Sequence, residues 1–168
     1  EVLKDGADIV CFSGDKLMGG PQSGIIAGRA RHVQALTKHP FFRALRCDKL
    51  VLSVLQSTAE HYLHDKCGEL PLQGMLTADL ASIQRRTRKL AKMLKGVPAK
   101  IDITPGHSQV GGGALPEVSL PTVTLNIVPN DIRLVDFAAR LRRATPPVIG
   151  SIGSRRFSLD LRTILPEQ

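Results

Sequence analysis

A lysine in a glycine-rich segment is the feature of this sequence best suited to chemistry. Residues 13–22 read S-G-D-K-L-M-G-G-P-Q and directly follow a short apolar run, residues 7–12, that is typical of a buried strand. A lysine at that place can lose solvation and become a nucleophile toward an aldehyde. Lys16 would then form a Schiff base with pyridoxal phosphate, and the glycines would let backbone amides approach its phosphate. Glycines also form plain turns, so the spacing alone leaves both interpretations open.

Two arginines form a second candidate site. Arg43 and Arg46 are three residues apart, which would place them on one face of a predicted helix over residues 41–64. Two guanidinium groups on one face could hold a single tetrahedral anion through paired hydrogen bonds. The alternative interpretation is a solvated basic face.

The elements that position these residues follow from hydrophobic spacing and from breaks at glycine and proline. In the first part of the chain we expect strands over residues 7–12 and 24–28, both buried in an α/β sheet. Helices are expected over 31–38 and over 41–64, with Pro40 as the interruption and the second helix as a connector between two lobes.

The second part of the chain has a different pattern of apolar and polar residues. After a break at 68–71, residues 77–94 predict an amphipathic helix with a strongly basic outer face. We then expect strands over 100–103 and 122–128, a helix capped by Asn130 or Asp131 and ending at Arg143, and short strands over 148–152 and 156–161. Helix, strand pair, helix and strand pair together predict a modest α+β lobe.

The composition excludes several classes of protein. The chain has 168 residues, 42% of them hydrophobic and 23% charged, which suits a globular protein with a real core. No stretch approaches the roughly 20 apolar residues of a membrane helix. The net charge of +8 would attract a polyanion such as RNA, but an aromatic content of 4% supplies few rings for base stacking. Cys11, Cys47 and Cys67 lack metal-ligand spacing, so we expect a reduced, cytoplasmic protein.

Four segments, in order along the chain, closely resemble the bacterial selenocysteine synthases, the L-seryl-tRNA(Sec) selenium transferases. The segments are F-S-G-D-K-L-M-G-G-P-Q-S-G-I-I-A-G, K-H-P-F-F-R-A-L-R-C-D-K, V-G-G-G-A-L-P-E-V-S-L-P-T and L-D-L-R-T-I-L-P. Such a set is far more specific than a lone glycine-rich loop. The sequence departs from the family pattern at A-L-P-E, residues 114–117, and in a degenerate hairpin over 150–155.

The resemblance implies the C-terminal part of a fold-type-I, aspartate aminotransferase-like transferase that depends on pyridoxal 5'-phosphate. Residues 1–64 would end the large cofactor domain and include the connecting helix, and residues 65–168 would form the small α+β domain. Such enzymes convert seryl-tRNA(Sec) to selenocysteinyl-tRNA(Sec) through a cofactor-bound aminoacrylyl intermediate, with selenophosphate as the donor. The family also implies a homo-oligomeric ring of dimers without membrane or DNA partners. The chain alone would be inactive, since it opens at Glu1 without an initiator methionine and resembles only the later part of the family.

The resemblance also implies roles for individual residues. Lys16 corresponds to the lysine that binds the cofactor and moves the α-proton, and Asp15 is similarly a family active-site position. Near the cofactor we expect Ser13, Gly19, Gly20 and Gln22. The arginines Arg43 and Arg46 would bind the selenium-donor anion.

Three other features favour plain structural interpretations. The five histidines, His61 and His64 among them, lack the further ligands that a zinc site needs, so no metal is expected. Residues 111–113, three glycines, are best explained as a turn. The basic residues Arg85, Arg86, Arg88, Lys89 and Lys92 are more simply a solvated helix face than a tRNA contact.

Two rival functions remain open. A related fold-type-I lyase or transferase could use Lys16 on a small amino acid without tRNA. Alternatively, the chain could be a non-enzymatic module that binds RNA through the basic helix, in which case binding would depend steeply on salt.

Overall fold

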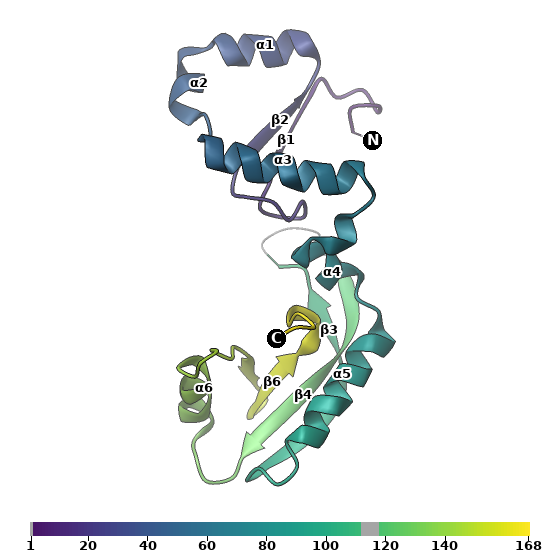
Figure 1. The fold of residues 1–168 in the computed structure, drawn as a ribbon, viewed down its shortest axis with the longest axis vertical. Coiled ribbons are helices and arrows are strands. Elements are labelled where there is room, and N and C mark those ends of the chain that lie inside the picture. Colours follow the sequence, from purple (N-terminus) through teal and green to yellow (C-terminus); the bar gives the residue numbers. More distant parts are fainter. Residues whose placement is uncertain (1, 112–117) are drawn as a thin grey trace. The chain divides into compact units, whose positions relative to one another are not determined.

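The chain forms two compact units, Glu1–Gly74 and Met75–Gln168, in a computed structural model that describes residues 2–111 and 118–168. Both units mix helices with strands (Figure 1). The division falls within a helix, α4 (Pro71–Thr77). The boundary predicted after residue 64 lies earlier, before the short η1 turn (Cys67–Glu69) and α4.

A β-hairpin opens the first unit. Strand β1 (Ile9–Ser13) pairs antiparallel with β2 (Gly24–Gly28), with Ile9 opposite Gly28 and Ser13 opposite Gly24. Both predicted strands are confirmed, but their predicted burial is wrong. The sheet has two strands, and the side chains of Phe12 and Ile26 are each 47% exposed.

Three helices follow the hairpin: α1 (Ala30–Lys38), α2 (Pro40–Leu45) and α3 (Lys49–Leu63). The prediction of one continuous helix over 41–64 is wrong. The side chain of Asp48 accepts a hydrogen bond of 2.9 Å from the backbone N–H of Val51, which caps a new helix. The C-cap of α2, Arg46, is extended at ψ 138°, so the chain turns out of one helix before it enters the next.

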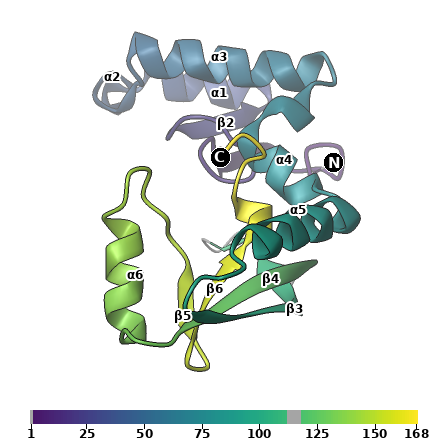
Figure 2. The same cartoon turned by 60° about the horizontal axis from the view of Figure 1, so that its bottom comes forward.

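The second unit is a four-stranded antiparallel sheet with two helices. Its strands are β3 (Ala99–Gln109), β4 (Ser119–Pro129), β5 (Ser151–Gly153) and β6 (Arg156–Asp160), in the spatial order β3-β4-β6-β5. The helices are α5 (Leu80–Met93) and α6 (Leu134–Arg142), and a short η2 turn (Leu161–Thr163) follows β6. Figure 2 shows α5 beside β3 and β4 and α6 on the side of β5 and β6. The predicted order of helix, strand pair, helix and strand pair is confirmed.

One face of this sheet and both helices make the core. Alternate residues of β4 and β6 point to the helices and are buried, and Ile83 of α5 and Ala138 of α6 pack against them. The buried strand residues are Val123, Leu125, Ile127, Phe157 and Leu159. Phe137 of α6 meets the ring of Phe157 edge to face, with centroids 5.6 Å apart.

Several boundaries differ from the sequence predictions. β3 and β4 are longer than predicted, because their outer halves pair with each other in continuous register from Ala99 opposite Pro129 to Gln109 opposite Ser119. The N-cap of α6 is Arg133, which makes no side-chain cap, so the predicted cap at Asn130 or Asp131 is wrong.

The start of α6 carries a local ion pair. Arg133 Nε donates to Asp136 at 2.7 Å, and this hydrogen bond holds the pKa of the Asp136 carboxyl below its ordinary value. Both groups lie at the solvent surface, where such pairs contribute little to stability.

Of the two segments that depart from the family pattern, the structure describes one. The hairpin over 150–155 forms, with Ser154 and Arg155 at φ 49° and 58°, the left-handed conformation that a tight two-residue turn requires. Residues 112–117 lie outside the described part of the chain. The A-L-P-E segment and two of the three glycines of 111–113 fall there.

Candidate functional site

The loop between β1 and β2 carries Lys16 and is closed by its own backbone. Gly14 N–H donates to the carbonyl of Ser23 at 2.9 Å, and Gly20 N–H donates to the carbonyl of Gly14 at 2.8 Å. Gly14 is buried, and a Cβ there would collide with the Ser23 side chain and lie 2.8 Å from the Pro21 carbonyl. Gly19 has φ +72°, which favours glycine. The glycines of this motif are therefore needed to fold the loop itself.

Lys16 lies in this loop with a half-exposed side chain. Its Nζ is 4.0 Å from Asp15 Oδ2, the outer limit of an ion pair, and the two side chains are 52% and 31% exposed. An ion pair this long and this exposed contributes little. The amine is accessible to an aldehyde, but the desolvation expected from the sequence is not provided by the described residues.

The amides of Gly19 and Gly20 are hydrogen-bonded to carbonyls of the same loop. Gly19 N–H donates to the carbonyl of Lys16 at 2.9 Å, and Gly20 N–H is used within the loop as described above. Both amides are therefore hydrogen-bonded within the loop, and the position of Gly19 and Gly20 near a cofactor phosphate stays a prediction. The side chains of Ser13, at the end of β1, and of Gln22 are exposed and flank the loop.

Residues of α3 and α4 hold the loop from outside, and sequence analysis missed them. The hydroxyl of Tyr62 donates to the Met18 carbonyl at 3.0 Å and accepts from Gln73 Nε2 at 2.7 Å. Gln73 Nε2 also lies 2.5 Å from the Leu17 carbonyl. We call Tyr62 and Gln73 the loop clamp. Their separation from the loop by more than 40 residues hides them from any local pattern, although Tyr62 is the chain's single tyrosine.

The buried Thr58 of α3 completes this packing. A Cβ on Gly20 would lie 3.2 Å from two atoms of the Thr58 side chain, so the glycine permits close approach of loop and helix. Helix α3 and the start of α4 therefore fix the side of the loop that follows Lys16.

Tyr62→Phe is expected to loosen this loop. Loss of the hydroxyl removes the donor to the Met18 carbonyl, at a cost of about 1 kcal/mol in local stability. Hydrogen exchange followed by mass spectrometry should show faster exchange of the amides of Gly19 and Gly20, with α5 and β4 unchanged. Leu63→Ala, at an 80% exposed neighbour, serves as control. Equal exchange in the loop of both variants would contradict the clamp.

The two arginines of the second candidate site do not share a helical face. Arg43 lies in the last turn of α2, whereas Arg46 is its extended C-cap, and both are exposed. The helical-spacing argument for one anion site is therefore wrong, since the helix ends between them. His39 of the same segment is an N-cap: its Nδ1 accepts from Phe41 N–H at 3.2 Å.

Residues 2–111 and 118–168 show neither a metal cluster nor a membrane-spanning helix. No group of three potential metal-ligating side chains occurs among them, and no helix there is long and apolar enough to cross a bilayer. His61 and His64 place Nδ1 at 2.7 Å and 2.8 Å from helix carbonyl oxygens. The three cysteines are free thiols.

The L-D-L-R segment has a structural role that its sequence did not reveal. Arg162 is buried, and its guanidinium donates to the carbonyls of Met75 at 2.9 Å and Pro121 at 2.7 Å, among others. Asp160 accepts from the hydroxyl of Thr122 at 2.7 Å and from that of Ser108. These side chains tie the end of α4 and the central strand to the C-terminal segment.

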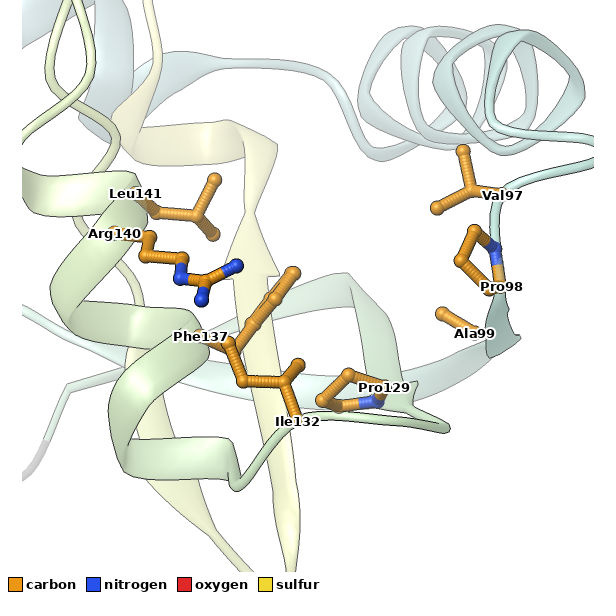
Figure 3. A pocket seen from close by; sticks show the side chains of 8 residues that line it. All are labelled: Val97, Pro98, Ala99, Pro129, Ile132, Phe137, Arg140 and Leu141. Atoms are coloured by element: carbon orange, nitrogen blue, oxygen red, sulfur yellow. The ribbon is translucent and has the colours of Figure 1, made fainter.

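A pocket of about 270 Å³ lies in the second unit, between the turn before β3 and α6 (Figure 3). Its lining is apolar except for Arg140. None of the predicted site residues lines it, and it offers no group of side chains for catalysis.

Comparison with known proteins assigns the chain to a family. The model of the L-seryl-tRNA selenium transferase family matches residues 1–165. An L-seryl-tRNA(Sec) selenium transferase of Geobacter sulfurreducens is 44% identical over 99% of this chain, and one of Carboxydothermus hydrogenoformans is 42% identical over 100%. A third, from Aquifex aeolicus, is 39% identical over 96% of the chain. The chain belongs to the L-seryl-tRNA selenium transferase family. It spans 37% of the length of the first two relatives and 36% of the third.

Proposed function

We propose that this chain is part of a selenium transferase that converts seryl-tRNA(Sec) to selenocysteinyl-tRNA(Sec), with selenophosphate as the donor and pyridoxal 5'-phosphate as the cofactor. The observation that carries the proposal is the accessible amine of Lys16 in a glycine-closed hairpin loop, in a chain of this family. A fold-type-I architecture accompanies the proposal, with residues 1–64 ending the large domain and residues 65–168 forming the small domain. A cytoplasmic ring of dimers is the proposed assembly.

The residues present fit the cofactor at its aldehyde. Lys16 offers a primary amine with no close ion pair among the described residues, whereas the amides of Gly19 and Gly20 are already used. Pyridoxal phosphate, when bound, supplies an aldehyde and an electron sink for negative charge at the seryl α-carbon. The small glycines would permit close approach of the cofactor, with Ser13 and Gln22 beside it.

Lys16 has two tasks in this proposal. Its Nζ holds the cofactor before substrate arrives and afterwards takes the proton from the α-carbon, because a freed amine beside that carbon is a general base. Asp15, whose Oδ2 lies 4.0 Å from Nζ, is the proposed active-site neighbour of this amine. The loop clamp keeps Lys16 near one position, which a proton transfer requires.

The assay that tests the function uses the full-length protein with pyridoxal phosphate. We expect seryl-tRNA(Sec) and selenophosphate to give selenocysteinyl-tRNA, detected by mass spectrometry of the released amino acid. Free serine in place of seryl-tRNA is expected to give no product. Equal turnover of free serine would instead favour a lyase that acts on a small amino acid. The 168-residue chain alone is expected to be inactive, since it spans about a third of its relatives.

Arg43, in the last turn of α2, and Arg46, in extended backbone, are proposed to bind the donor anion. Replacing either with Ala is expected to raise the KM for selenophosphate about tenfold, since a charge-assisted hydrogen bond contributes about 1.5–3 kcal/mol. The KM for seryl-tRNA should stay the same. Lys49→Ala, at the neighbouring start of α3, is the control. If both arginine variants behave like this control, the anion role is wrong.

A further inference from the structure

The outer face of α5 carries a line of cations. Arg85, Arg88, Lys89 and Lys92 are all exposed and recur at intervals of three and four residues. This spacing places them on one side of the helix over a length of about 10 Å, at 1.5 Å per residue. We call these four residues the basic stripe.

The stripe lies opposite the buried side of the helix. Ile83 and Thr87 are buried, at 1% and 0% exposure, and face the sheet. Arg86 does not belong to the stripe, although it stands between its members in the sequence. Its guanidinium donates to the carbonyls of Leu161 at 3.1 Å and Ile164 at 2.7 Å, so it anchors the C-terminal segment.

Within the described parts of the chain, nothing neutralises the stripe. Helix α5 contains no acidic residue, and its N-cap Asp79 accepts from the backbone N–H of Ser82. The ion pairs among the described residues involve none of the four cations. Like charges at these spacings destabilise a helix by about 0.2–0.5 kcal/mol per pair. The arrangement therefore costs stability that an external polyanion would restore.

The aromatic residues indicate which part of a nucleic acid fits. The second unit contains only Phe137 and Phe157 as aromatic residues, and they pack together in the core. Neither of these phenyl rings is free for base stacking, which is how proteins hold single strands. A row of cations without rings suits the phosphates of a double helix, which it contacts without reading sequence.

We propose that the basic stripe of α5 binds the phosphate backbone of a double-helical RNA arm. The choice of RNA rests on the proposed function, whose substrate is a tRNA. The second unit would then contact the helical part of the substrate, and this contact is separate from the chemistry at Lys16.

The test compares two variants of equal charge. The stripe variant carries R85Q, R88Q, K89Q and K92Q, and the control carries K4Q, K100Q, R142Q and R143Q, four other exposed cations. Each lowers the net charge from +8 to +4, because four positive charges are removed from each. Binding of the 168-residue chain to an uncharged tRNA transcript is measured by fluorescence anisotropy over a range of salt concentrations.

We expect the stripe variant to bind tRNA at least tenfold more weakly at 0.1 M salt. The slope of log K against log salt should lose about 3 units of magnitude, at about 0.7–0.9 per phosphate contact. The control should lose less than 1 unit. Circular dichroism checks the fold, and if the stripe variant does not fold, R88Q and K92Q are measured singly, with an expected slope change of about 0.8 each.

Three outcomes would overturn the proposal: equal loss in both variants, unchanged binding by the stripe variant, or tighter binding of the unaltered chain to a single-stranded oligouridine or to anionic lipid vesicles than to the tRNA. Because the transcript carries no serine and no cofactor is added, this binding measurement does not depend on the chemistry at Lys16. If the proposed chemistry fails, the binding result can still be interpreted. If the binding proposal fails, the test of the chemistry is unaffected.

Discussion

Borohydride reduction of the full-length protein loaded with pyridoxal phosphate is expected to leave a pyridoxyl group on Lys16. Reduction converts the bond between Nζ and the cofactor's aldehyde carbon into a stable amine, and digestion followed by mass spectrometry locates it. Lys16→Ala should abolish this label and lower the rate of selenium transfer by about 10³-fold or more, since both the attachment point and the proton acceptor are lost. This is the largest effect that we expect from any single substitution in the chain.

Lys38→Ala is the matched control. Lys38 is an exposed lysine of the same unit, at the end of α1 rather than in the hairpin loop. It should keep both the label and the rate. A pyridoxyl group on another lysine, with Lys16 unlabelled in a saturated protein, would show that this loop does not hold the cofactor.

Arg162→Ala is expected to destabilise the second unit by about 2–4 kcal/mol, the second-largest effect. The side chain is 6% exposed and donates to carbonyls from the end of α4 and from Pro121, which precedes the buried part of β4. Its removal leaves several carbonyls without a donor in an interior that excludes water. Arg162 forms no ion pair within 4.0 Å with a carboxylate of the described residues. Removal of its buried charge therefore offsets part of this loss of stability.

Urea unfolding of the 168-residue chain measures this loss. Arg142→Ala, at an exposed arginine of α6, is expected to change the free energy of unfolding by less than about 0.5 kcal/mol. Arg162→Lys should recover little, because one ammonium group cannot span carbonyls on two segments as a planar guanidinium does. If Arg162→Ala unfolds like Arg142→Ala, the buried arginine is not a structural tie.

Local sequence signals were sufficient for much of the fold. The period of apolar residues located α5, β3, β4 and β6, since each buries one face against a neighbour. A polar, helix-compatible pattern located α1, which has no buried residue. The break between α2 and α3 was missed, because the apolar period of residues 41–64 continues across it. The extended backbone at Arg46 ends the first helix, and Asp48 caps the second, so Arg46 does not share a helical face with Arg43.

For the candidate site, the residue types along the chain predicted the chemistry, and the tertiary structure determined the hydrogen bonds and exposure of the residues involved. The motif around Lys16 predicted an amine in a glycine-rich loop. In the structure a Cβ at Gly14 would collide with the Ser23 side chain, and Gly19 has a positive φ that favours glycine. The structure decided that the glycine amides hold the loop and that Tyr62 and Gln73 clamp it. It also separated Arg86, bound to carbonyls, from the exposed stripe. Hydrogen bonds between distant segments leave no period in a sequence, so only the tertiary structure could reveal these contacts.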